Sequence, residues 1–282
     1  MPDLLEPFSY SYMVNAIWVS ALVGAVCGFL SAYIMLKGWS LIGDALSHSV
    51  VPGVAGAYML GLPYSVGAFF SGGLAAIAML FISSRSRLKT DVVIGLIFSG
   101  FFALGLFMIS IRPASVRIET IIFGNILSIS PEDSIQLVII SVVSLLVLVF
   151  IWKDLMVVFF DESHAMSVGL NATLLKVVFF TILSACTVAA LMAVGAFLVV
   201  AMVVTPGAIA YLLTDRFPTL LCISITAGAV CSALGCYISY FVDGVTGGVI
   251  ILLMTIVLLF VFLFAPTHGL FVSRQKMKEA VS

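Results

Sequence analysis

Apolar residues occur along this chain in long runs, which are separated by short polar or glycine- and proline-containing stretches. The runs cover approximately residues 13–36, 40–62, 65–83, 92–111, 134–152, 173–213, 219–241 and 249–265. An α-helix needs about 20 apolar residues to cross the hydrocarbon core of a bilayer, so most of these runs have the length of one crossing. They lack the polar residue at every second position that is typical of a membrane β-barrel. The pattern therefore predicts an all-α, polytopic membrane helix bundle.

Two stretches leave the number of crossings open. The run at residues 173–213 is too long for one crossing, and we expect it to divide near residues 193–196. Residues 118–127 are apolar but short, which suits a helix at the membrane surface or a re-entrant piece. We therefore predict nine crossings, or eight if one of the shorter pieces does not traverse the bilayer. We find no linker, low-complexity segment or internal repeat, and expect a single transmembrane domain over residues 1–282.

Composition and charge support this interpretation. The chain is 63% apolar and only 9% charged, whereas soluble domains carry roughly 25% charged residues. Placing the N-terminus outside puts ten of the twelve Lys and Arg residues on one face of the membrane, and only Arg112 and Arg117 on the other. Because cytoplasmic loops carry an excess of Lys and Arg, we expect a short extracytoplasmic N-terminus and a cytoplasmic basic tail at residues 267–282. The five cysteines all lie inside apolar runs, so we expect core residues rather than disulfides or a thiolate metal site.

Asp44 and His48 are the most informative residues of the chain, because they are ionisable groups inside an apolar run. Four residues apart, they would lie on one face of a helix, about 5–6 Å apart at Cβ. Such groups are costly in a membrane unless they line a polar path or meet a partner, and carboxylate oxygen with imidazole nitrogen suits Mn²⁺, Fe²⁺ or Zn²⁺. Pro52 lacks the N–H that would bond the His48 carbonyl. The stretch predicts a cation path; the alternatives are a buried structural ion pair and a polar cap at helix entry.

A second polar segment, FDESHAMSVG at residues 160–169, interrupts the apolar pattern. Asp161 and Glu162 suit the start of a short helix, and Gly169 suits its end. Ala165 and Met166 would offer contacts to another protein, although an ordinary solvated loop explains the segment equally well. There is no phosphate-binding loop and no sign of a covalent reaction. The residues alone leave a channel, an ion-coupled carrier, or a permease driven by a separate ATPase.

Three motifs together carry a family resemblance. They are SLIGDALSHSVVPG at residues 40–53, the FDExxAxxxG pattern at residues 160–169, and VGAFLVVAMVVTPG at residues 194–207. In this order, and over nearly the whole chain, they resemble the membrane permease subunits of bacterial ATP-binding-cassette importers for manganese, zinc and chelated iron. The similarity is greatest to the manganese and chelated-iron systems of enteric bacteria. It implies a permease fold related to that of the vitamin B12 importer, with fewer helices.

The resemblance also implies roles for particular residues. Asp44 and His48 would carry the metal contact of the pore. Residues 160–169, with Phe160, Asp161, Glu162, Ala165 and Gly169, would form a coupling helix on the ATPase. Pro52 and Pro206 would act as hinges, although a packing kink explains Pro206 too.

Partners and location follow from the same resemblance. It implies a multi-pass protein of the bacterial plasma (inner) membrane with a second permease subunit, either a second copy or a paralogous chain. It also implies cytoplasmic ATP-binding subunits, which would hydrolyse the ATP, and an extracytoplasmic metal-binding protein. The chain itself would be no enzyme and would hold no permanent cofactor, its cargo being Mn²⁺ or Fe²⁺, or else Zn²⁺. We expect lipid around it and no nucleic acid. The rival interpretations are an ion-coupled secondary metal carrier and a scaffold or sensor that transports nothing.

Overall fold

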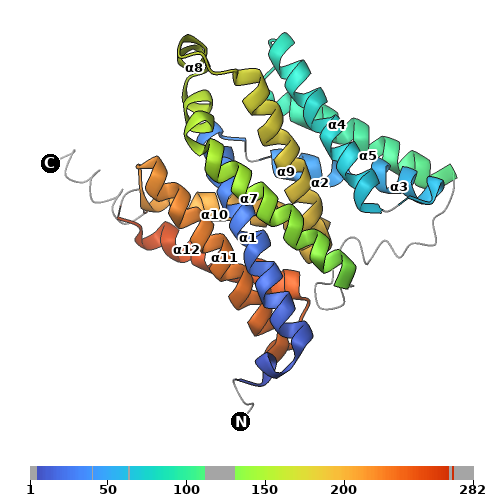
Figure 1. Cartoon of the computed structure of the whole chain (residues 1–282), viewed down its shortest axis with the longest axis vertical. Helices are drawn as coiled ribbons and strands as arrows, with labels where there is room; N and C mark the ends of the chain where they lie inside the picture. Colours follow the sequence, from blue (N-terminus) through green and yellow to red (C-terminus); the bar gives the residue numbers. More distant parts are fainter. Residues whose placement is uncertain (1–4, 40, 63, 112–130, 267–268, 270–282) are drawn as a thin grey trace.

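The computed structural model describes residues 5–39, 41–62, 64–111, 131–266 and 269. In this part of the chain all regular secondary structure is helical (Figure 1). The elements are η1 (Glu6–Ser9), α1 (Ser11–Lys37), α2 (Ile42–Ser49), α3 (Val51–Leu60), α4 (Tyr64–Arg85), α5 (Thr90–Ile111), α7 (Pro131–Phe160), α8 (Glu162–Ser167), α9 (Ala172–Val194), α10 (Ala196–Leu213), α11 (Phe217–Val242) and α12 (Thr246–Phe264).

Seven of the described helices are long and apolar enough to cross a membrane, namely α1, α4, α5, α7, α9, α11 and α12. The shorter α10 and the pair formed by α2 and α3 account for the two other apolar segments. The prediction of an all-α membrane bundle is confirmed, and the expected eight to nine crossings agree with this order of segments.

Two helix boundaries can be compared with those predicted from the sequence, and only one of them agrees. The run at residues 173–213 divides at Gly195, whose φ of 87° is readily adopted by glycine, as predicted. The predicted end of the fifth span at residue 152 is wrong, because α7 continues to Phe160 through Lys153 and Asp154. Both charged side chains are exposed on the helix surface, so they do not interrupt its backbone hydrogen bonds. Residues 118–127 and most of the basic tail lie outside the described residues.

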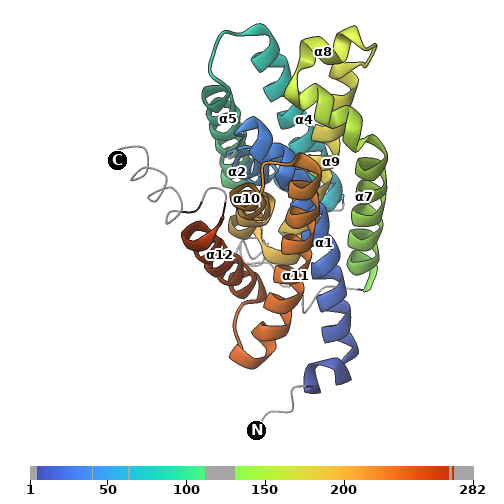
Figure 2. The same ribbon diagram turned by 90° about the vertical axis from the view of Figure 1, so that its left-hand side faces the viewer.

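Helix α1 lies at the centre of the bundle and contacts α7, α9, α10 and α11 (Figures 1 and 2). Its small residues explain the close approach to α11. A Cβ atom on Gly24 would lie 2.3 Å from the Gly228 carbonyl oxygen, and one on Gly28 would lie 2.3 Å from that of Ser224. Without a hydrophobic drive between helices in lipid, such close backbone packing is a main source of association.

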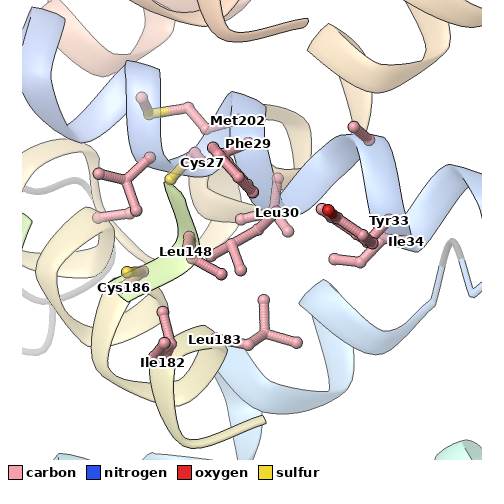
Figure 3. Packing of buried hydrophobic residues seen from close by; sticks show 14 of the residues in the cluster. Cys27, Phe29, Leu30, Tyr33, Ile34, Leu148, Ile182, Leu183, Cys186 and Met202 are labelled. Atoms are coloured by element: carbon pink, nitrogen blue, oxygen red, sulfur yellow. The ribbon is translucent and has the colours of Figure 1, made fainter. Parts of the chain in front are cut away.

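The buried core surrounds the second half of α1 (Figure 3). Cys27, Leu30 and Tyr33 from this helix meet side chains of α7 and α9, including Leu148 and Cys186. The Tyr33 hydroxyl donates to the Trp152 carbonyl at 2.7 Å, which gives this buried polar group a partner. All five cysteines are free thiols and four are buried, as expected of core residues; Cys222 is exposed.

The two ends of the molecule differ in charge. Helix α8 and the α4–α5 connection lie at one end, and the start of α1 lies at the other (Figures 1 and 2). The described Lys and Arg residues belong to segments at or toward the α8 end: the last turn of α1, the α4–α5 connection, the last part of α7, the start of α9 and the α10–α11 connection.

Candidate metal pathway at a broken helix

The segment that carries Asp44 and His48 is a broken helix. Helices α2 and α3 meet at Val50, two residues before Pro52, which lies in the first turn of α3. The missing proline N–H is the physical reason for the break, although the sequence predicted only a released His48 carbonyl in one continuous span. The His48 carbonyl is not simply released, however, because the N–H of Val50 is directed at it within the turn.

Contacts from α4 and α5 hold the break in place. The Ser71 hydroxyl of α4 donates to the Ser49 carbonyl at 2.6 Å. A Cβ atom on Gly53 would lie 2.0 Å from the Gly67 carbonyl oxygen of α4, and one on Gly105 of α5 would lie 2.9 Å from the Pro52 nitrogen. The backbones thus touch on two sides of the break, which fixes the direction of α2.

Asp44 and His48 lie together on α2, as their spacing predicts. The Nε2 atom of His48 is 3.3 Å from Oδ1 of Asp44. The His48 side chain is 17% exposed and the Asp44 side chain is 43% exposed. Asp44 is in the first turn of α2 and His48 is in the last. The helix dipole favours a carboxylate at the first position and a cation near the second.

Aromatic side chains of α5 define the other side of the imidazole. The rings of Phe98 and Phe102 lie 5.3 and 5.4 Å from the His48 ring, both nearly edge to face. These neighbours were not predicted, because an apolar run in lipid gives no sign of which phenylalanines face a polar group. They limit the directions from which His48 can be reached.

The pair can offer a metal ion one carboxylate and one imidazole. Among the described residues no group of three or more His, Cys, Asp or Glu side chains could hold a metal ion. Four protein ligands are usual for a structural zinc site, so this pair is half of such a set.

Helix α10 lies on the other side of α2 (Figure 2). A Cβ atom on Gly43 would make ordinary contacts with Val203 at 3.5 Å, so this approach is looser than that of α4 or α5. Pro206 lies inside α10, as predicted.

A serine that the sequence analysis missed bridges backbone groups on either side of Pro206. The Ser31 hydroxyl of α1 donates to the Val204 carbonyl at 3.0 Å and accepts from the Gly207 N–H at 2.8 Å. A Cβ atom on Gly207 would lie 2.5 Å from the Ser31 carbonyl oxygen. The only sequence signal for this contact was a polar residue within the apolar run of α1.

The segment at residues 160–169 forms the short helix α8 at one end of the molecule (Figure 1). The Asp161 carboxylate accepts from the Ser163 and His164 N–H groups at 2.9 and 3.1 Å, and so caps the helix. Gly169 ends the segment with a φ of 86°. Glu162 pairs with Lys176 of α9. These positions agree with the predicted helix start and stop.

The expected outward contact of Ala165 is wrong for this subunit. Its side chain is fully buried in the core cluster, so it anchors α8 to the bundle. The exposed apolar side chains of the segment are those of Phe160, Met166 and Val168. They, rather than Ala165, are available to a partner.

Comparison with known proteins identifies the family. Residues 9–265 match the model of a family described as the ABC 3 transport family. The chain belongs to this family. The predicted resemblance is thereby confirmed, and this ABC 3 permease is a multi-pass membrane transport protein.

Its relatives and structural neighbours have informative names. The permease is 64% identical to the chelated iron transport system membrane protein YfeC of Yersinia pestis, over 98% of this chain and 94% of that protein. It is 45% identical to the manganese transport system membrane protein MntB of Synechocystis, over 95% and 87% of the two chains. The solved structure of PsaBC from Streptococcus pneumoniae in complex with Fab contains a chain with a TM-score of 0.83 and 34% identity, covering 94% of this chain and 96% of that one. The relatives are named as transport membrane proteins, in agreement with a permease subunit that is not itself an enzyme.

Proposed function

We propose that this ABC 3 permease imports a divalent metal ion, Mn²⁺ or Fe²⁺, by alternating access, with Asp44 and His48 as the contact for the ion. Relatives named for manganese and chelated iron support the class of cargo. Zn²⁺ is a third candidate, because carboxylate and imidazole ligands suit all three ions.

The observation that carries the proposal is the pair itself. A carboxylate and an imidazole 3.3 Å apart stay partly exposed within an otherwise apolar bundle, on a helix that contacts both α5 and α10. Ionisable groups in membrane helices usually face a bundle interior or a water-filled path and mark ion routes. A second permease subunit across a two-fold axis, either a second copy or a paralogous chain, would complete a set of two oxygens and two nitrogens. The absence of a thiolate suits a site that must also release its ion.

The remaining partners follow from the two ends of the bundle. The end that carries α8 and the described Lys and Arg residues would face the cytoplasm of a bacterial cell, by the positive-inside rule. There α8, exposing Phe160, Met166 and Val168, would receive the movement of a separate ATPase subunit that hydrolyses ATP. An extracytoplasmic metal-binding protein would deliver the ion at the opposite end, and Pro52 and Pro206 would serve as hinges.

The test is metal uptake by the reconstituted complex of permease, ATPase and binding protein. Asp44→Asn and His48→Gln each remove one ligand while keeping side-chain size. Changing even a supporting residue of a metal site costs about 10–100-fold in affinity or activity, so uptake of radiolabelled Mn²⁺ or Fe²⁺ should fall at least tenfold. ATP hydrolysis by the variant complexes should persist, which separates a lost ion contact from a lost assembly.

Asp91→Asn is the matched control. Asp91 is also an aspartate in the first turn of a neighbouring helix, α5, but it is exposed. Its variant should retain uptake. Wild-type rates in both ligand variants would refute the role of the pair, and uptake that continues after ATP is removed would favour a secondary carrier.

A further inference from the structure

An apolar groove lies near the α8 end of the bundle, and its lining includes Ile42 of α2, two residues before Asp44. It is shallow, with a cavity volume of about 20 Å³, and is lined by residues of α2, α4, α5 and α9 together with Trp39. Ile42, Met79, Ile94 and Phe180 give it a buried apolar wall. The groove is therefore too shallow to enclose a ligand, but an apolar chain can lie along its wall.

Ser83 and Thr90 are the only hydroxyl-bearing residues among those that line the groove. They stand at the end of α4 and the start of α5, on either side of the short connection between these helices. The polar part of the groove is thus where the connection begins and ends.

The α4–α5 connection carries three exposed cations within five residues, namely Arg85, Arg87 and Lys89. The Arg85 guanidinium lies over the Phe81 ring at 4.3 Å, which holds its stem along the apolar surface of α4. Neither ion pair recorded for the described residues involves any of the three. Asp91 is the one acidic side chain in the adjoining turn, so the connection has a net positive charge.

The surface of α4 and α5 beside the groove is apolar and exposed in this chain. Ile77 and Phe81 of α4 and Val92 of α5 are exposed apolar side chains in helices long enough to cross a bilayer. For a membrane lipid next to these helices, the groove would lie at the depth of the acyl chains. The three cations would lie at the level of the lipid headgroup.

We propose that this groove and the α4–α5 connection bind one anionic phospholipid. Part of an acyl chain lies along the groove against Ile42 and Phe180, and the phosphate lies among Arg85, Arg87 and Lys89. The charge of the connection selects the class of headgroup, because basic clusters at a membrane surface attract anionic lipids. The start of α5 at Thr90 adds the positive end of a helix dipole on the same side. A zwitterionic lipid could place an acyl chain along the groove, but it has no net negative charge to offset the three cations.

Trp39 lines the groove and provides a direct probe of its occupancy. The chain has three tryptophans, so replacing Trp18 and Trp152 by Phe leaves Trp39 as the only reporter. The full chain is placed in vesicles that contain a small fraction of brominated phosphatidylglycerol in phosphatidylcholine, or brominated phosphatidylcholine in phosphatidylglycerol. We expect the anionic brominated lipid to quench Trp39 at least twofold more strongly, at equal mole fraction.

A charge-neutral variant identifies the cause of this preference. With Arg85, Arg87 and Lys89 all changed to Gln, the two brominated lipids should quench equally. The control Arg216→Gln removes an exposed cation of the α10–α11 connection and should keep the preference. Phosphatidylglycerol retained on the purified wild-type chain should also exceed that on the triple variant, a measurement that needs no tryptophan replacement.

Three results would overturn the proposal. If both brominated lipids quenched Trp39 equally in the chain with wild-type cations, the groove would hold only ordinary boundary lipid. If the triple Gln variant kept its preference for phosphatidylglycerol, the three cations would have no part in lipid binding. Loss of the quenching when the ATPase subunit binds would assign the connection to a protein partner instead.

Discussion

The contact between Gly207 of α10 and Ser31 of α1 allows a quantitative prediction. In Gly207→Ala the new methyl group would lie 2.5 Å from the Ser31 carbonyl oxygen and 2.6 Å from its hydroxyl. An ordinary contact starts near 3.4 Å, so the two backbones must move apart by about 0.9 Å. Overpacking of this kind costs roughly 1–3 kcal/mol.

The displacement also affects the hydrogen bonds of Ser31. Its bonds at 3.0 and 2.8 Å would lengthen, and polar bonds between membrane helices are worth about 0.6 kcal/mol each. Alanine gains roughly 0.5–1 kcal/mol over glycine in a helix, which offsets part of the loss. The net result is a destabilisation of about 2 kcal/mol.

A thiol-reactive dye can measure this effect during heating, because four of the five cysteines are buried until the chain unfolds. At about 2–4 °C per kcal/mol, the apparent Tm of Gly207→Ala should fall by about 4–8 °C. Gly73→Ala is the matched control, since Gly73 lies within α4 and its Cβ would contact nothing within 4 Å. That variant should keep or slightly raise the Tm. An equal Tm for the two alanine variants would refute the close contact of α1 with α10.

The remaining predictions concern hydrogen bonds that hold the broken helix and α8. Ser71→Ala removes the hydroxyl that bonds the Ser49 carbonyl, and should lower the Tm by about 1–2 °C, since about 0.6 kcal/mol is at stake. Ser99→Ala, whose hydroxyl bonds the Gly95 carbonyl of its own helix, should not lower it, and identical behaviour of the two variants would count against the role of the Ser71–Ser49 bond. Asp161→Ala removes the cap of α8, which is worth about 1 kcal/mol, so hydrogen exchange of the amides of α8 should quicken about fivefold. Asp154→Ala, at an exposed position of α7, should leave that exchange unchanged, and slow exchange in both would mean that the cap contributes little.

The sequence predicts the helices well because lipid imposes a simple rule on them. A run of apolar residues long enough to span the bilayer must form a helix, since its backbone groups have no other partners there. The same rule does not fix the ends, and α7 continues past Lys153 because its charged side chains reach the surface. Nor does it say which helices touch, because small residues that permit close packing occur in several of them.

The candidate site was predictable as far as local spacing reaches. The four-residue separation predicted the proximity of Asp44 and His48, whereas the division of residues 40–62 into two helices near Pro52 was not predicted. The contacts of His48 with Phe98 and Phe102 required the fold, because α5 carries many interchangeable apolar residues. The burial of Ala165 also depended on tertiary packing, which a short polar segment does not reveal.

The hydroxyl of Ser31 has a mechanical consequence for α10. A proline inside a helix removes one backbone hydrogen bond, and here a side chain from another helix bonds backbone groups on both sides of the proline. Helix α1 therefore stabilises α10 at its proline through these two hydrogen bonds. Any flexing at Pro206 must either rupture both bonds of this hydroxyl or carry the central helix of the bundle along with it.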